Sequence, residues 1–492
     1  MSDPQAVTKD YVAIIDIGSN AVRLVVYDGL NRAPSRIHTE RTICNLGADL
    51  ATTGYLNPDA VKRALDSLRR FSGLIAAMKI KNTRAVATAA LRDAKDGKSF
   101  IEKVQKESGL EISIIDGEEE ARLSALGVLA NGFGGTGVIG DYGGGSLELI
   151  VVENHQVRHK ASLPLGSHRL RAEKNRAARV KMIEARLDSA GFLKDCAGLD
   201  FYAMGGAWRS LATAHMHMSQ YPLKLLDHYQ LEGKKAAEFA ALVARKSPPA
   251  LEKIAGMSKG RAGDMNVAAL ALEILFKKIR PRRLIFSGTG LREGLLFDQL
   301  NPALLKQDAL LASCVKISGV TSRGGDLKIL HRWMEPLFAG QSAEFSRLLG
   351  ASCLLSDVSS LEHEDYQAEH AFRRILVMNF YGIDHAGRAF LALSQYVRYK
   401  GRLHAEVTAP VQKLLGRKMT SLAMTAGLAQ RLGYLLTGGA LDLLPHVELK
   451  LTPKQLVLKL NAPADRLNAG VIGDALRGLA ESMGREAVLL TE

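Results

Sequence analysis

Short runs of apolar and β-branched residues alternate with longer stretches of helical spacing up to about residue 300. The runs that predict strands are residues 11–15, 23–27, 85–90, 111–115, 200–204 and 283–286. Helical spacing covers residues 57–78, 99–106, 169–186 and 266–276, and another helix is expected to begin after Asp116. This alternation is typical of an α/β protein.

The remainder of the chain has mainly helical spacing. Apolar residues recur at helical intervals in residues 308–314, 326–338, 345–355, 368–380, 387–398 and 411–434. Residues 447–451 and 455–460 then alternate as strands around a Thr-Pro-Lys turn, and residues 469–483 are amphipathic at helical spacing. The chain is therefore expected to end in a helical region followed by a small α+β unit.

Two stretches of the chain share one plan. Residues 14–26 read IIDIGSNAVRLVV and residues 138–152 read VIGDYGGGSLELIVV, so each consists of a strand, an Asp-x-Gly turn, a small polar residue and a second strand. A plan that recurs in this way indicates an internal duplication. Two such hairpins facing each other across a cleft can hold a phosphate chain, because glycine lets the backbone approach the ligand closely.

The second hairpin combines two acids with three glycines. Asp141 and Glu148 flank Gly143, Gly144 and Gly145, and Ser146 follows the glycines. Backbone N–H groups in such a turn can point at an anion, and carboxylate oxygens bind divalent cations. The pattern therefore predicts a site for phosphate and a divalent cation.

Three consecutive acids, Glu118, Glu119 and Glu120, open the helix that begins after Asp116. Asp116 with Glu119 matches a capping box, and the helix dipole favours acids there, which accounts for Glu118 and Glu119. A carboxylate at such a turn can also act as general base on water, and the spacing does not choose between Glu119 and Glu120. Arg92 is open to two interpretations, an ordinary surface arginine or a bidentate phosphate ligand.

Composition narrows the class of protein. The 492 residues are 47% hydrophobic and carry a formal net charge of +14, which indicates either an anionic partner or a solvated basic surface. The four cysteines are far apart and include no C-x-x-C pair, which argues against a zinc ribbon or a disulfide scaffold. The first residues lack a signal-peptide pattern and no apolar run reaches membrane-spanning length, so a soluble, cytoplasmic protein is expected.

Seven segments in one order resemble the motifs of the exopolyphosphatase/guanosine-pentaphosphate phosphatase family. They are DIGSNAVRL (16–24), ATAALRDA (87–94), DGEEEARL (116–123), DYGGGSLEL (141–149), LPLGS (163–167), RAGD (261–264) and GLREG (290–294). The resemblance implies an α/β fold of two ribonuclease-H-like domains of the actin-like and sugar-kinase superfamily, with a cleft between them. The expected boundaries are residues 1–133 and 134–303 for these domains, 304–440 for a mostly helical HD-like domain, and 441–492 for the small α+β unit.

The resemblance also implies roles for individual residues. It places the general base on Glu120 and the arginine that contacts the terminal phosphate on Arg92. The acids associated with a metal would be Asp141 and Glu148, and Asp16 in the first hairpin is expected as a further metal ligand. The residues expected to bind phosphate are Gly18, Ser19, Asn20, Arg23, Gly143, Gly144, Gly145, Ser146, Gly206 and Arg261. The expected cofactor is Mg²⁺, with Mn²⁺ as the alternative, and a monovalent cation such as K⁺ is a further candidate.

Two positions depart from the family's pattern. Ala207 follows the glycine pair at 205–206 where the family has a threonine, so a hydroxyl that could contact phosphate is lost. The proline expected in the loop before Arg261 is absent.

The helical region differs from an active HD-type phosphohydrolase. Ser356 and Asp357 stand where the metal-binding His-Asp pair would be, so this domain is expected to be non-catalytic. Metal binding by His363 or His370 is the alternative.

Three functions remain open from the sequence. An exopolyphosphatase would release orthophosphate from inorganic polyphosphate, and a guanosine pentaphosphate (pppGpp) phosphohydrolase of the stringent response would use the same catalytic residues. An ATP-dependent kinase or an actin-like ATPase is the third, disfavoured by acids suited to activating water and by the lack of an adenosine-pocket signature.

The basic segments 398–402 and 413–418 fit either a path for a long polyanion or solvated helix faces. The first interpretation favours polyphosphate over pppGpp as the substrate. No nucleic acid and no membrane insertion are expected, and the family's habit indicates a homodimer.

Overall fold

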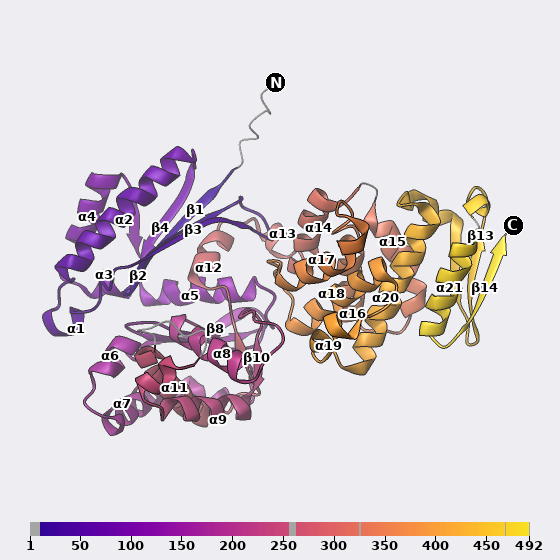
Figure 1. The fold of residues 1–492 in the computed structure, drawn as a ribbon. Helices are drawn as coiled ribbons and strands as arrows, with labels where there is room; N and C mark the ends of the chain where they lie inside the picture. Colours follow the sequence, from indigo (N-terminus) through magenta and orange to yellow (C-terminus); the bar gives the residue numbers. More distant parts are fainter. Residues whose placement is uncertain (1–9, 255–261, 324–325, 468, 492) are drawn as a thin grey trace. The chain divides into compact units, whose positions relative to one another are not determined.

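The computed structural model describes residues 10–254, 262–323, 326–467 and 469–491. The chain forms two compact units, Met1–Lys306 and Gln307–Glu492, which are described separately (Figure 1). Among the described residues, no helix combines the length and the apolar character needed to cross a bilayer.

The first sheet of unit Met1–Lys306 has the strand order β3-β2-β1-β4-β5. Its strands are β1 (Val12–Ile17), β2 (Ala21–Tyr27), β3 (Arg36–Ile43), β4 (Asn82–Ala87) and β5 (Ile112–Ile114). β1 pairs with β2 in antiparallel and with β4 in parallel orientation. The hairpin predicted from the first apolar runs is therefore confirmed.

The second sheet repeats this arrangement, with the order β10-β11-β9-β6-β7-β8. Its strands are β6 (Gly137–Tyr142), β7 (Leu147–Glu153), β8 (Gln156–Leu163), β9 (Phe201–Met204), β10 (Gln230–Glu232) and β11 (Arg283–Phe286). β6 is antiparallel to β7 and parallel to β9, as β1 is to β2 and β4. The matching pairings confirm the internal duplication.

Helices cover both faces of each sheet. They are α1 (Leu50–Thr53), α2 (Pro58–Ala77), α3 (Ala89–Asp93), α4 (Gly97–Ser108), α5 (Gly117–Leu129), α6 (Ser167–Ala172), α7 (Arg176–Ser189), the 3-10 turn η1 (Gly191–Asp195), α8 (Gly206–Met218), α9 (Gly233–Ala244), α10 (Pro248–Glu252), α11 (Ala262–Ile279), α12 (Leu291–Phe297) and α13 (Pro302–Leu305). Buried side chains of α2 and α4 pack on one face of the first sheet and those of α12 on the other. The second sheet is covered on one face by α8, α9 and α11.

Helix α5 lies between the two sheets (Figure 1). Its Leu123 belongs to the apolar cluster of the first sheet, together with Val12 and Ile14. Its Ala125 and Val128 belong to a cluster of the second sheet. Since one helix is fixed by both sheets, the side chains of its first turn are held at the boundary between them.

Three features of this unit differ from the sequence prediction. The strand expected at 85–90 ends at Ala87, and α3 begins at Ala89, because alanines are the strongest helix formers once the chain leaves the sheet. The helix expected at 169–186 is divided into α6 and α7, because Asn175 caps a new helix by accepting a hydrogen bond from the Ala178 N–H. The edge strands β3 and β8 were not predicted, because most of their side chains are exposed and show no apolar alternation.

Unit Gln307–Glu492 is mainly helical and ends in a small sheet. Its helical elements are α14 (Ala309–Thr321), α15 (Leu327–Met334), η2 (Glu335–Phe338), α16 (Ala343–Leu354), α17 (Glu364–Val377), α18 (His385–Lys400), α19 (Ala405–Gln412), α20 (Gly416–Thr437), η3 (Leu441–His446), η4 (Ala464–Leu467) and α21 (Gly470–Ser482). The sheet has the order β12-β13-β14, from β12 (Val447–Leu451), β13 (Gln455–Leu460) and β14 (Glu486–Thr491). Helix α18 is buried along most of its length.

In this unit the prediction of one helix over 411–434 is wrong. The segment is divided between α19 and α20, because Gly416 at the start of α20 has a φ of +71°, which interrupts a right-handed helix. β12 and β13 have the predicted bounds, whereas β14, which is parallel to β13, was not predicted. The predicted fold class is confirmed: duplicated α/β sheets precede a mostly helical region with a small sheet. The domain boundaries at 133/134, 303/304 and 440/441 stay predictions.

Candidate active site

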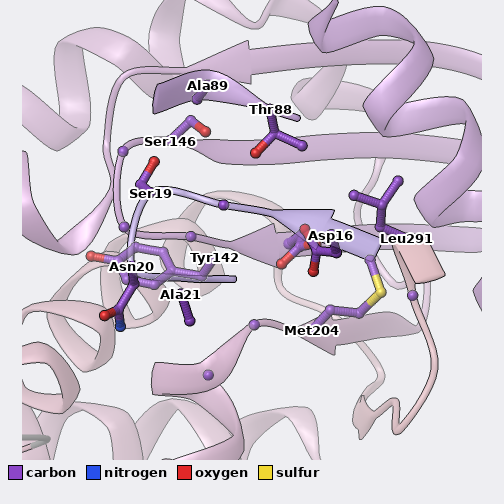
Figure 2. Close-up of a pocket in the computed structure, with 18 of the residues that line it drawn as sticks. Asp16, Ser19, Asn20, Ala21, Thr88, Ala89, Tyr142, Ser146, Met204 and Leu291 are labelled. Carbon is purple, nitrogen blue, oxygen red and sulfur yellow. The ribbon is translucent and has the colours of Figure 1, made fainter. Parts of the chain in front are cut away.

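A cavity of about 440 Å³ opens between the two duplicated hairpins of unit Met1–Lys306 (Figure 2). Residues of both turns form its wall, and Figure 2 shows Asp16 and Ser19 of the first hairpin together with Ser146 of the second. The predicted site residues that line it are Asp16, Gly18, Ser19, Asn20, Arg23, Glu120, Asp141, Gly143, Gly144, Gly145, Ser146, Glu148 and Gly206. Segments far apart in the sequence therefore meet in one place.

The two hairpin turns are closed by the same hydrogen bond. The Gly18 N–H donates to the Ala21 carbonyl at 3.1 Å, and the Gly143 N–H donates to the Ser146 carbonyl at 3.0 Å. The tips also approach each other, since a Cβ built on Gly145 would lie 3.7 Å from Ser19 Oγ. Two glycine turns of matching form thus face one cavity and present backbone dipoles suited to an anion.

The acids of the second hairpin are direct neighbours across the sheet. Asp141 pairs in register with Glu148, and Ser162 Oγ donates a hydrogen bond to Glu148 Oε1 at 3.1 Å. At the matching register of the first hairpin, Asp16 lies opposite Arg23, and their charged groups are 3.9 Å apart. One hairpin therefore presents two carboxylates and the other an ion pair.

Glu120 reaches the cavity from the first turn of α5. Asp116 caps this helix by accepting a hydrogen bond from the Glu119 N–H at 2.8 Å. Glu119 is held in a bidentate pair by Arg122, with both contacts at 2.7 Å, and does not line the cavity. Of the two acids between which the spacing did not choose, Glu120 lies on the cavity wall, and its role as general base stays a prediction.

Arg92 is bonded to Glu120 and does not belong to the cavity wall. Its Nη1 donates to Glu120 Oε2 at 3.2 Å and to the Ile115 carbonyl at 2.9 Å. Arg92 lies in the last turn of α3 and does not directly follow the strand predicted at 85–90, which ends at Ala87. The predicted residue Arg261 lies outside the described residues.

Three of the acids that line the cavity, Glu120, Asp141 and Glu148, have raised pKa values. Burial raises the pKa of Glu120, and the charges of Glu148 and Asp141 raise it further, while Arg92 lowers it. Burial and Asp141 raise the pKa of Glu148. Burial also raises the pKa of Asp141, and Asp16 adds to the effect against the opposing charge of Arg209. Such a cluster favours a proton or a cation within it.

Arginines form another part of the wall. Arg23, Arg41, Arg209 and Arg292 line the cavity. Burial lowers the pKa of Arg209 to about 10, with Arg292 adding to the effect, so Arg209 is still charged at neutral pH. Its Nη2 donates to the Gly288 carbonyl at 3.4 Å, and its buried Nε has no hydrogen-bond partner within the described chain. This charge can bind an anion in the cavity.

Gly205 sets the direction in which α8 leaves the second sheet. Its φ is +92°, and a Cβ there would lie 2.1 Å from the Tyr142 carbonyl oxygen. The turn brings Gly206, the first residue of α8, to the cavity wall. The N-terminus of a helix of this length adds positive potential to the anion-binding wall.

Some cavity residues were missed by the sequence prediction. They are Thr39, Arg41, Thr88, Arg209 and Arg292. Arg209 lies one turn after the glycine pair, and Arg292 lies in α12 within the motif at 290–294, so both positions carried a signal.

The helical unit does not supply a comparable acidic site. His363 caps α17, and His370 Nδ1 lies 2.8 Å from Glu362 Oε2. Asp357 is paired with Arg323 and Arg398. In the part of the chain that the structure describes, no three His, Cys, Asp or Glu side chains are grouped so that they could hold a metal ion.

Two family models match the chain. Residues 25–303 match the Ppx/GppA phosphatase family, and residues 334–490 match the C-terminal region of exopolyphosphatase.

Individual relatives carry several names. Retrograde regulation protein 2 of Saccharomyces cerevisiae is 23% identical over 82% of this chain and 75% of its own length. Exopolyphosphatase 1 of Mycobacterium tuberculosis is 24% identical over 63% of this chain and 95% of its own length. A guanosine-5'-triphosphate,3'-diphosphate pyrophosphatase of Aliivibrio fischeri is 35% identical, but the match spans only 31% of each chain.

Solved structures match part of the chain. The Ppx/GppA family member of Aquifex aeolicus is 27% identical with a TM-score of 0.51, over 59% of this chain and 97% of its own. An exopolyphosphatase from Cytophaga hutchinsonii, 24% identical with a TM-score of 0.52 over 59% of this chain and 99% of its own, shares the fold.

Proposed function

The chain belongs to the Ppx/GppA phosphatase family, and from this premise we propose that it is an exopolyphosphatase. It hydrolyses the terminal phosphoanhydride of inorganic polyphosphate and releases orthophosphate. The observation that carries the proposal is the wall of the 440 Å³ cavity, where Glu120 faces two glycine turns and four arginines. These are the parts that phosphoryl transfer to water requires: a base, an anion cradle and positive charge.

Glu120 is proposed as the general base. It takes a proton from water as the water oxygen bonds to the terminal phosphorus, and the bridging P–O bond breaks so that the shortened chain leaves as an oxyanion. The proton is then passed to solvent, which restores the carboxylate. A raised pKa suits this role, because a base works best when its pKa is near the working pH.

Arg92 is proposed to orient the base. Its Nη1 holds Glu120 Oε2 at 3.2 Å and is itself anchored on the Ile115 carbonyl. The family resemblance implies that Arg92 contacts the terminal phosphate. For this contact, its guanidinium would have to release Glu120 and bind a substrate oxygen instead. The terminal phosphates are proposed to lie against the N–H groups of the two glycine turns, with Arg23 and Arg209 beside them.

The carboxylates fit a hard divalent cation, and we propose Mg²⁺, with Mn²⁺ as the alternative. Asp141 and Glu148 would hold it with Asp16 nearby, and all supply the oxygen donors that Mg²⁺ prefers. Mg²⁺ is commonly held by one or two carboxylates plus substrate phosphates, which agrees with a described chain that has no cluster of three ligands. When bound, the cation would neutralise charge on the phosphate oxygens.

Polyphosphate is preferred over pppGpp for two reasons. The formal net charge of +14 suits a long polyanion. The relative named exopolyphosphatase aligns over 95% of its own length, whereas the more identical guanosine relative aligns over 31%. The pppGpp phosphohydrolase is the second candidate, favoured by that higher identity of 35%.

A release assay with long polyphosphate, tripolyphosphate and pppGpp tests the proposal. Orthophosphate release from long chains at a kcat/KM at least tenfold above that for pppGpp is the expected result. The reverse ratio would assign the chain to the second candidate. Formation of ADP from ATP with an acceptor, without release from either substrate, would overturn hydrolysis altogether.

A further inference from the structure

A second cavity, of about 270 Å³, lies within unit Gln307–Glu492, far along the chain from the acids described above. Its lining residues are Arg323, Arg398, Arg431, Tyr434, Leu435 and Gly438. Three of the six are arginines, and we call this site the arginine cavity. None of its residues belongs to the proposed active site.

Asp357 pairs with two of the three guanidinium groups of the arginine cavity. Arg323 Nη2 donates to Asp357 Oδ1 at 3.0 Å, and Arg398 Nη2 lies 3.3 Å from the same oxygen. Arg431 Nη1 instead donates to the Tyr399 carbonyl at 2.8 Å. The side chains of Asp357 and Arg398 are only 4% and 10% exposed, so water does little to screen these charges. The arginine cavity therefore holds more positive than negative charge.

Arg398 is a buried arginine with one donor that lacks a partner among the described residues. The residue is 8% exposed, and its buried Nε has no hydrogen-bond partner within the described chain. Its guanidinium is fixed by two rings, at 3.9 Å from the centroid of Tyr434 and 4.1 Å from that of Tyr399. Burial and the positive charge of Arg398 lower the pKa of Arg431. Buried like charges of this kind are stabilised by an anion between them.

We propose that the arginine cavity binds a small phosphate-bearing anion, such as pyrophosphate or the end of a phosphate chain. Its volume of about 270 Å³ is below the range typical of drug-sized ligands. The ring of Tyr434 already has Arg398 at 3.9 Å and Arg323 at 5.5 Å, which leaves it poorly suited to stacking on a nucleobase. Guanidinium groups match phosphate oxygens in both charge and geometry. The inference does not depend on the proposed hydrolysis.

The alternative is that the arginines only brace Asp357. Such a network needs Arg323 and Arg398 but gives no reason for Arg431, which contacts no carboxylate among the described residues. A substitution at Arg431 therefore distinguishes binding from bracing.

Calorimetric titration of the full chain with imidodiphosphate, a pyrophosphate analogue that is not hydrolysed at its P–N–P bridge, tests the proposal. We expect one site in the arginine cavity besides any site in the active-site cavity. Arg431→Gln should weaken binding at the arginine cavity by about tenfold or more. Arg209→Gln should leave the affinity of the arginine cavity unchanged. The control is Arg373→Gln, since Arg373 is 70% exposed and pairs with Glu369 at 3.6 Å.

A second variant keeps the test conclusive if Arg431→Gln does not fold. Arg323→Gln removes a side chain that is 44% exposed, and it should weaken the same site, with circular dichroism verifying the fold. Parallel titrations with orthophosphate and long polyphosphate distinguish a free small anion from a chain end, and binding of either supports the proposal. Isotherms that are identical for wild type, Arg431→Gln and Arg323→Gln would overturn it. Because no hydrolysis is measured, this failure is distinct from failure of the proposed function.

Discussion

Glu148 lies directly across the β6–β7 ladder from Asp141, whereas Arg23 occupies the matching place opposite Asp16 on β2. The duplicated hairpins thus have the same strand pairing and the same turn hydrogen bond. At one matching position, however, the first hairpin has an arginine and the second has a glutamate. The second hairpin can hold a cation between its acids, and the first leaves an arginine for an anion. In the proposed complex of Mg²⁺ and phosphate, this difference would let one repeated motif serve both the cation and the anion.

Replacing Glu120 by glutamine tests the general base. Glu120→Gln keeps the shape of the side chain but cannot take a proton, so kcat for polyphosphate should fall by roughly 10²- to 10⁴-fold. The control is Glu118→Gln, because Glu118 is 78% exposed and lies two positions away on the same helix. Orthophosphate release by Glu120→Gln within a few-fold of wild type would remove Glu120 from the chemistry.

Arg92→Gln should change the pH dependence as well as the rate. The charge of Arg92 lowers the pKa of Glu120, so its removal raises that pKa and fewer molecules carry the carboxylate at a given pH. The acidic limb of the kcat/KM profile should therefore move to higher pH, with kcat reduced about 10- to 100-fold. Arg69→Gln, at a side chain 48% exposed, is the control. A lower kcat with an unmoved limb would assign Arg92 to another role.

Most of the fold could be predicted from the sequence, because in the buried strands the local pattern of apolar residues agrees with the tertiary structure. β11, β12 and β13 have the predicted bounds, since their side chains show the burial that apolar runs predict. β3 and β8 were missed because an edge strand with exposed side chains has no apolar period. Arg41, which reaches the cavity from the region of β3, was missed for the same reason.

The candidate site could be predicted where residues with suitable chemistry lie within a recognisable sequence motif. Asp141, Glu148 and the glycines between them were identifiable, because few other functions place acids around a glycine turn. The position of Arg92 behind Glu120 could not be predicted, because it depends on the short helix α3 and on the Ile115 carbonyl. Such contacts arise only when distant segments pack.

The raised pKa of Glu148 predicts a stability that falls with pH in the absence of a divalent cation. The folded state binds the proton of Glu148 more tightly than the unfolded chain does, since glutamates in an unfolded chain have a pKa of about 4.3. Stability is therefore full below that value and is lost as the pH rises through the higher folded pKa. Calorimetry in EDTA should show Tm falling from pH 5 to pH 8, and Glu148→Gln should reduce the fall. Mg²⁺ should restore Tm at pH 8, and an unchanged Tm would argue against a cation there.

Gly205→Ala tests whether the turn before α8 is required. The added Cβ would lie 2.1 Å from the Tyr142 carbonyl oxygen at a φ of +92°, so the free energy of unfolding should fall by about 1–3 kcal/mol or more. Gly73→Ala is the matched control, because no atom lies within 4 Å of a Cβ at that helical site, and it should stabilise by about 0.5–1 kcal/mol. Equal urea midpoints for the two variants would mean that the turn adjusts freely.

Arg209→Gln tests whether the buried arginine binds substrate. Arg209 lines the cavity, and its Nε has no hydrogen-bond partner among the residues that the structure describes. Its positive charge opposes the rise in the pKa of Asp141, so its loss should affect both phosphate binding and the proposed cation site. We expect KM for polyphosphate to rise about tenfold or more and the requirement for Mg²⁺ to increase as the pKa of Asp141 rises. Arg245→Gln, at an exposed arginine, controls for the loss of one surface charge. If both variants shift KM equally and added salt abolishes the difference from wild type, Arg209 acts only through general charge and makes no direct contact with phosphate.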